Sequence, residues 1–190
     1  MRYPFNTLKS QLLCLALILF SLNLYACGPK AFQGRVSPAP EWVFTPLEQW
    51  DQKRYTQTGE FVIHGEGLSK GQQLISKRRA LADANATQDV KKRFVALYTR
   101  SLAGAAYREA FIKLMTELSW EQIALNNERY FDVEKNQQHT LVSVNETRII
   151  DALNFERSMD QQGVTDWNQV FQSIKTMYQG LKGLKNRNPQ

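Results

Sequence analysis

An unbroken run of nine apolar residues, Leu12–Phe20, lies close to the N-terminus and determines which part of the chain is left to fold as a domain. Arg2 and Lys9 make the start of the chain basic. A membrane-spanning helix needs about 20 apolar residues, so this run is too short to cross a bilayer. A basic start followed by a short apolar run is instead typical of a secretory signal peptide, which is removed after export.

The signal region ends in Leu24-Tyr25-Ala26-Cys27, which resembles the lipobox of bacterial lipoproteins. The small residue before the cysteine fits the signal peptidase, and the cysteine thiol then receives diacylglycerol. Tyr25 departs from the small residue that is usual at its position. The resemblance predicts cleavage between Ala26 and Cys27, and a Cys27 that carries fatty-acyl chains such as palmitate. The alternative is an ordinary secretory signal in which Cys27 is incidental.

The two cysteines of the chain, Cys14 and Cys27, both lie in the first 27 residues. Cys14 would leave with the signal peptide and the lipid would block Cys27, so the body of the protein has no thiol. This distribution excludes a disulfide-stapled fold, a cysteine-ligated zinc site and a cysteine nucleophile there. In lipoproteins an aspartate after the cysteine causes retention at the inner membrane, so Gly28 predicts an outer-membrane protein that faces the periplasm.

The distribution of prolines and apolar residues predicts four segments. Residues 28–40 hold three of the six prolines and two of the ten glycines, which indicates an extended tether. Downstream of the tether the chain is rich in apolar side chains, which indicates a packed core. The segments are a signal peptide over 1–26, the lipidated cysteine and tether over 27–40, an α+β domain over 41–160, and an amphipathic helix with a basic tail over 161–190.

Hydrophobic periodicity predicts the elements of the body. Residues 61–64 suit a short strand that ends at the tight turn Gly65-Glu66-Gly67, whereas Pro46 and the polar stretch 48–58 argue against a long element before it. A helix is expected from about 70 to 100, and a second helical run over 107–125. The stripe that the first helix turns toward the sheet consists of Ala80, Ala84, Thr87, Phe94 and Tyr98.

The second half of the body predicts a hairpin between helices. Residues 130–134 and 140–144 flank a polar turn over 135–139, and a helix is expected over 147–159. One face of the last helix is apolar, and it consists of Trp167, Phe171, Ile174, Tyr178 and Leu181. The fold class is therefore α+β, with a small antiparallel sheet of about three strands packed by long helices and a C-terminal amphipathic helix.

Three of these features together resemble the LPP20-like family of bacterial lipoproteins, whose domain is also similar to the N-terminal part of flagellar assembly protein T. They are Pro40-Glu41-Trp42-Val43 after the lipidated cysteine, the alanine-rich helix with Arg79-Ala80-Leu81-Ala82-Asp83-Ala84, and the late hairpin followed by a helix. The resemblance covers roughly residues 40–155. It implies a small α+β domain in an envelope lipoprotein and provides no catalytic residues.

Other candidate chemistry is weakly supported. Gly65-x-Gly67 lacks the third glycine of a dinucleotide fingerprint, since Lys70 stands there, and no ribose-binding acid follows on a second strand. The two histidines, His64 and His139, could meet across a sheet and hold a metal ion, but strand-edge histidines are the simpler interpretation. We therefore expect no catalytic residue, no metal and no cofactor.

Two basic triplets, Lys77-Arg78-Arg79 and Lys91-Lys92-Arg93, lie 14 residues apart on the long helix. Fourteen residues are close to four helical turns, so the triplets fall near one side of the helix. They predict a surface for an anionic partner, and the alternative is a solvated face that binds nothing.

Together these features favour a lipid-anchored cell-envelope protein with a structural or accessory assembly role and no catalytic activity. The alternative is a periplasmic binding module for an anionic lipid or glycan, or for a motility or secretion component. Such a module would use the basic helix face or the apolar face of the last helix. Nucleic acid is not an expected partner on the periplasmic side.

Overall fold

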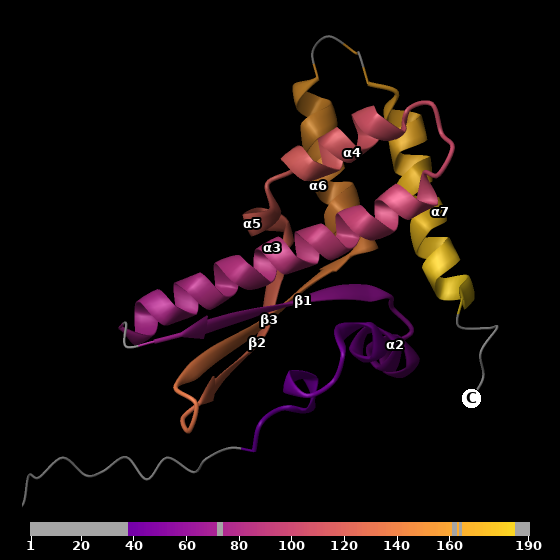
Figure 1. Ribbon diagram of the computed structural model, residues 1–190. Coiled ribbons are helices and arrows are strands. Elements are labelled where there is room, and N and C mark those ends of the chain that lie inside the picture. The colour runs from indigo at the N-terminus through magenta and orange to yellow at the C-terminus, as the bar shows by residue number, and fades with distance from the viewer. Residues whose placement is uncertain (1–37, 72–73, 161–162, 164, 185–190) are drawn as a thin grey trace, which may run out of the picture. The chain divides into compact units, whose positions relative to one another are not determined.

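A computed structural model describes residues 38–71, 74–160, 163 and 165–184, and a compact unit begins at Ala39 (Figure 1). The predicted signal peptide and Cys27 lie outside the described residues. Among the described residues, no helix is both long enough and apolar enough to cross a membrane.

The fold is α+β, which confirms the predicted class. The strands are β1 (Val62–Lys70), β2 (Leu125–Asp132) and β3 (Gln137–Asn145). They form an antiparallel sheet in the order β1-β3-β2. The helices are η1 (Glu41–Val43), α2 (Leu47–Thr58), α3 (Ile75–Ser101), α4 (Arg108–Glu117), α5 (Trp120–Ile123), α6 (Glu146–Met159) and α7 (Trp167–Leu184).

The long helix α3 crosses one face of the sheet, here called the inner face, whereas η1 and α2 lie on the outer face (Figure 1). Two glycines of β1 make the inner contact close. A Cβ atom at Gly67 would lie 1.9 Å from the carbonyl oxygen of Ala82, and one at Gly65 would lie 2.4 Å from the amide nitrogen of Val90. The tight turn predicted at these glycines is therefore wrong, because the strand continues through them to Lys70.

The inner face of α3 is also shifted from the predicted stripe. Ala80 and Ala84 are exposed, whereas Ala82 and Ala86 are fully buried against β1. Thr87, Phe94 and Tyr98 are buried as predicted. Buried positions recur at intervals of four, close to one helical turn, and they are Ala82, Ala86, Val90, Phe94 and Tyr98. The first three lie against β1, whereas Phe94 and Tyr98 contact α5 and α7.

Helix α2 occupies the stretch that was expected to hold no long element. Pro46 immediately precedes its first residue, and Gly59 follows its last residue in the left-handed conformation, with φ 74°. Proline at the start and a left-handed glycine at the end are common boundaries of helices. The helix buries only Trp50 and Asp51, so hydrophobic periodicity does not reveal it.

The predicted second helical run over 107–125 is divided in the structure. It contains α4 and α5, and Leu125 already begins β2. The hairpin turn is shorter than expected because Asn136 adopts a left-handed φ of 51°, so β3 begins at Gln137 and includes His139. Helix α6 confirms the helix expected over 147–159.

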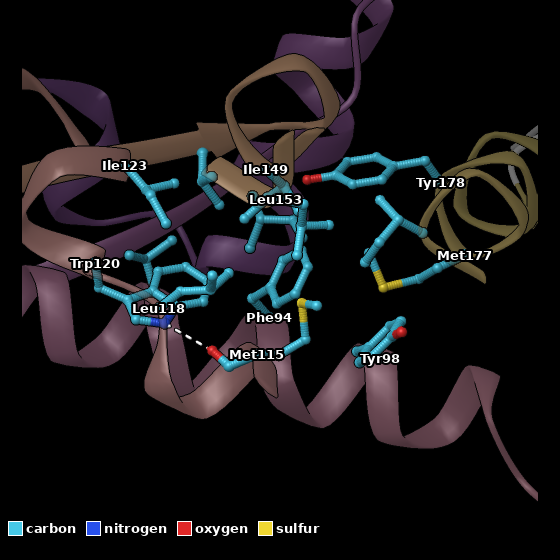
Figure 2. Close-up of a cluster of buried hydrophobic side chains, with 14 of the residues drawn as sticks. Phe94, Tyr98, Met115, Leu118, Trp120, Ile123, Ile149, Leu153, Met177 and Tyr178 are labelled. Atoms are coloured by element: carbon cyan, nitrogen blue, oxygen red, sulfur yellow. Dashed lines mark hydrogen bonds between the residues drawn. The ribbon is translucent and has the colours of Figure 1, made fainter. Parts of the chain in front are cut away.

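The main core lies between the C-terminal half of α3 and the helices α4 to α7 (Figure 2). Phe94 packs against Trp120 with ring centroids 5.3 Å apart, and the Trp120 indole nitrogen donates to the Met115 carbonyl at 2.9 Å. Tyr98 and Ser173 share a hydrogen bond of 2.5 Å that links α3 to α7. Burial raises the pKa of Tyr98 to about 12, so this hydroxyl keeps its proton at neutral pH.

Candidate functional site

Three side chains from three elements meet at the free edge of β1 and form what we call the Asp51 clamp: Asp51 of α2, His64 of β1 and Arg93 of α3. One oxygen of Asp51 lies 2.7 Å from His64 Nδ1 and accepts the His64 amide at 3.1 Å. The other oxygen accepts Arg93 Nη2 at 2.9 Å, and Arg93 Nη1 donates to the His64 carbonyl. Asp51 and His64 are 4% and 3% exposed, so the clamp is a buried ionic network.

The clamp is part of a wider arrangement that covers the edge of β1. Alternate residues of this strand direct their amide and carbonyl groups away from the sheet, where no neighbouring strand lies. Asp89 accepts the Glu66 amide at 3.1 Å, and Asn85 donates to the Leu68 carbonyl at 2.9 Å. Side chains of α2 and α3 thus take the place of a further strand for four outward groups, the amide and carbonyl of His64, the amide of Glu66 and the carbonyl of Leu68.

Beside the clamp, the outer face of the sheet contains a recess of about 540 Å³. Its lining is mostly polar and includes His64, Asn127, Glu128 and Ser143, with Trp50 at one side. The Trp50 ring meets His64 edge-on at 6.5 Å, and its buried indole nitrogen has no hydrogen-bond partner among the described residues. A polar molecule could find hydrogen-bonding groups here.

The clamp orients His64 as a carboxylate orients the histidine of a hydrolytic triad. Ser143 lies directly opposite His64 in the sheet register, so the Ser143 hydroxyl is on the strand next to His64. That hydroxyl, however, donates to Asn127 Oδ1 at 2.9 Å. The histidine and the hydroxyl are therefore not coupled, and the arrangement is better suited to holding α2 on the sheet than to acyl transfer.

The two histidines lie on the same outer face but do not form a common site. His139 pairs with Leu68 in the register, four positions along β1 from His64, which separates them by about 13 Å. His139 Nδ1 lies 3.1 Å from Glu66 Oε1, and its ring meets Trp42 at 6.4 Å. Within the described part of the chain, no group of three or more potential ligands (His, Cys, Asp or Glu) is placed to hold a metal ion.

The two basic triplets do not form one free surface. Arg93 belongs to the Asp51 clamp, and Arg78 is buried, where it donates to the Gly71 carbonyl at 3.3 Å and covers the Phe131 ring at 4.8 Å. The predicted anionic-partner surface is thus wrong for these two residues. Lys77, Arg79 and Lys92 are exposed and Lys91 is half-buried.

The predicted partner face of the last helix is largely internal. Ile174 and Tyr178 are fully buried in the main core, and Trp167, Phe171 and Leu181 are half-buried and pack against it. Helix α7 therefore completes the domain and does not offer this face to a partner. The amphipathic pattern itself could not distinguish a core from a docking surface, because both require an apolar stripe.

A second ion pair fixes β2 to α3. Asp83 accepts Arg129 Nε at 3.1 Å, Arg129 Nη2 at 2.7 Å and the Thr140 hydroxyl at 2.8 Å. Burial alone would raise the pKa of Asp83, but the hydrogen bonds from Arg129 and Thr140 outweigh it and lower this pKa. The ionised carboxylate is therefore the form that the fold prefers.

Asp83→Asn is expected to lower the free energy of unfolding at neutral pH by about 1 kcal/mol, because a charge-assisted pair is lost at a partly exposed site. A lowered folded-state pKa stabilises the fold above the unfolded value of 3.8, and this contribution is lost as pH falls through the folded value. The difference in free energy of unfolding between the wild type and Asp83→Asn should therefore become smaller in urea titrations as the pH is lowered below the unfolded value of 3.8. Asp151→Asn, at an exposed aspartate, is the control, and an equal loss there would contradict the assignment.

Comparison of the chain with protein-family models and with curated proteins finds no match. The resemblance to LPP20-like lipoproteins therefore stays a prediction. The lipidation and cleavage residues, Cys27 and Ala26, lie outside the described residues. Sequence reasoning missed Asp51 and Trp50 because both lie on α2, although Pro46 and Gly59 could have indicated that helix.

Proposed function

We propose that this is a lipid-anchored protein of the cell envelope, held at the periplasmic side of the outer membrane, with a structural or accessory assembly role. The observation that carries the proposal is the sequence Leu24-Tyr25-Ala26-Cys27 directly after a short apolar run. The compact unit begins at Ala39, so lipidation at Cys27 would leave a short proline-containing segment between the anchor and the domain.

The roles of the polar side chains support an assembly function over a catalytic one. The best-oriented histidine, His64, is part of the Asp51 clamp, and the nearest hydroxyl, on Ser143, is bonded elsewhere. Asp83 and Arg129 likewise join α3 to the sheet. These groups stabilise the fold, and the surface and the outer-face recess remain for contacts with other molecules.

The test is intact mass and membrane fractionation of the native protein beside Cys27→Ser. The native protein is expected to carry the mass of its acyl chains and to partition with the outer membrane, since several buried acyl chains anchor a protein stably. Cys27→Ser should lose both properties. Cys14→Ser is the matched control, because that cysteine lies in the predicted signal region and should leave lipidation intact. A native protein without acyl mass would contradict the proposal.

A further inference from the structure

One end of the domain exposes three aliphatic side chains that the core does not use. Leu74 and Ile75, at the start of α3, are 70% and 56% exposed, and Val133, in the turn between β2 and β3, is 63% exposed. Isolated exposed apolar residues are common on protein surfaces, whereas several at one end of a domain suggest a contact surface.

Hydrogen bonds hold the two turns that carry these side chains next to each other. Arg78 donates to the carbonyl of Gly71 at 3.3 Å and also to the side chain of Asn136. The side-chain Nδ2 of Asn136 in turn donates to the Gly71 carbonyl at 3.4 Å. Lys70 and Gln137 close the same end as a register pair of the sheet. The aliphatic side chains therefore belong to one surface.

The same end is basic. Asp132 and Glu134 are its acidic residues in the described turns, and Asp132 lies 3.5 Å from Lys135. The exposed cations outnumber them, and they are Lys70, Lys77, Arg79 and Lys135. We call this surface, with Leu74, Ile75 and Val133, the basic tip.

Neither feature of the basic tip helps the domain to fold. Leu74 occupies the N-cap of α3 and provides no side-chain hydrogen bond, where Ser, Thr, Asp or Asn would stabilise the helix. The first turn of α3 has no acidic residue, and Lys77 and Arg79 lie near the positive end of the helix dipole. A contact with an anionic surface would bury the exposed aliphatic groups and neutralise these cations.

We propose that the basic tip rests on the anionic phospholipid surface of the membrane that anchors the protein, with Leu74, Ile75 and Val133 entering the interface. Aliphatic side chains bordered by lysine and arginine match the chemistry of such a surface. The chain also enters the domain close to this end, because Trp42 packs against His139, two residues from Gln137. The inference rests on the proposed function and assigns a second membrane contact to the same protein.

The test separates this contact from the lipid anchor. The Cys27→Ser chain, produced from residue 27 onward, would be sedimented with vesicles of phosphatidylcholine alone and with vesicles of equal parts phosphatidylcholine and phosphatidylglycerol. We expect binding to the anionic vesicles and a fall in binding as salt is raised, since salt screens surface charge. Absence of binding to the anionic vesicles would overturn the inference.

The aliphatic part of the surface is tested by Leu74→Asp combined with Ile75→Asp. This variant should lose at least about tenfold in vesicle binding, because the two side chains that would enter the membrane interface become charged. Its fold should not weaken at the cap, since aspartate is a good N-cap. The control is Phe155→Asp combined with Met159→Asp, two residues of α6 with exposures of 64% and 63%. An equal loss in the control would overturn the inference.

The charge is tested in the same way. Lys77→Gln combined with Arg79→Gln should weaken binding by about fivefold for each charge removed. Lys91→Gln combined with Lys92→Gln removes the same charge farther along α3 and should have a small effect. An equal effect of the two pairs would overturn the basic tip as the contact. If the native protein is acylated but its Cys27→Ser form does not bind these vesicles, the lipid anchor stands and the basic tip is not a membrane contact. If the protein is never acylated but binds the vesicles, the lipid anchor is overturned and the basic tip stands.

Discussion

Gly67→Ala is expected to unfold the domain or to lower its free energy of unfolding by about 3–5 kcal/mol. The new Cβ atom would lie 1.9 Å from the Ala82 carbonyl oxygen and 2.4 Å from the Ala86 amide nitrogen. Both are backbone atoms of α3, so no side-chain rotation can remove the clash. The helix would have to move away from the sheet and lose its packing. Since a domain has only about 5–15 kcal/mol of stability, the effect should be large in urea unfolding followed by circular dichroism.

Gly180→Ala provides the matched control. Gly180 lies within α7, and a Cβ atom there would meet no atom within 4 Å. Alanine is the better helix former by about 0.8–1 kcal/mol, so this variant should be as stable as the wild type or slightly more stable. A Gly67→Ala protein with an unchanged free energy of unfolding would show that α3 does not approach β1 as closely as described.

The second large effect is expected at the Asp51 clamp. Asp51→Ala would leave the His64 ring nitrogen, the His64 amide and one Arg93 nitrogen without the carboxylate that accepts them, at a largely buried site. Removing one partner of a buried ionic network costs about 3–5 kcal/mol, because the remaining charge loses its buried counter-ion. The exposed Glu48 carboxylate, 3.5 Å from Arg93, replaces that counter-ion only in part. The free energy of unfolding, measured by urea titration followed by circular dichroism, should fall by this amount.

The control for the clamp is Glu48→Ala. Glu48 lies 3.5 Å from the same Arg93 nitrogen, but its side chain is 77% exposed. An exposed ion pair contributes about 0–1 kcal/mol, so this change should be nearly neutral. If Asp51→Ala is as mild as Glu48→Ala, the clamp does not fasten α2 to the sheet.

The parts of the fold that follow from local pattern could be predicted. The apolar alternation of Thr140, Val142 and Val144 identified β3, and all three are buried on the inner face. Helix α6 and the amphipathic helix α7 follow from residue spacing. A pattern reports which residues need burial but not what buries them, which is why the internal role of Ile174 was not visible in the sequence.

Other features depend on long-range contacts. Asp51 and Arg93 are 42 positions apart, and only the packing of α2 and α3 on one sheet edge brings them together. Gly65 and Gly67 were interpreted as a turn because a turn and a close helix approach both require a missing side chain. The basic triplets suggested a single surface, but Arg78 is buried and bonded to Gly71, and Arg93 is bonded to the buried Asp51 of α2.

The two margins of the sheet differ in a way that limits self-association. Along β1 four outward backbone groups are bonded to the side chains of Asp51, Asn85, Asp89 and Arg93. Among the described residues no further strand pairs with β2, and the first residues of β2 are exposed. A second copy would therefore add a strand more readily at β2 than at β1. Two copies joined in this way would each use the open edge of β2, so strand pairing would favour a closed pair over a continuing ribbon.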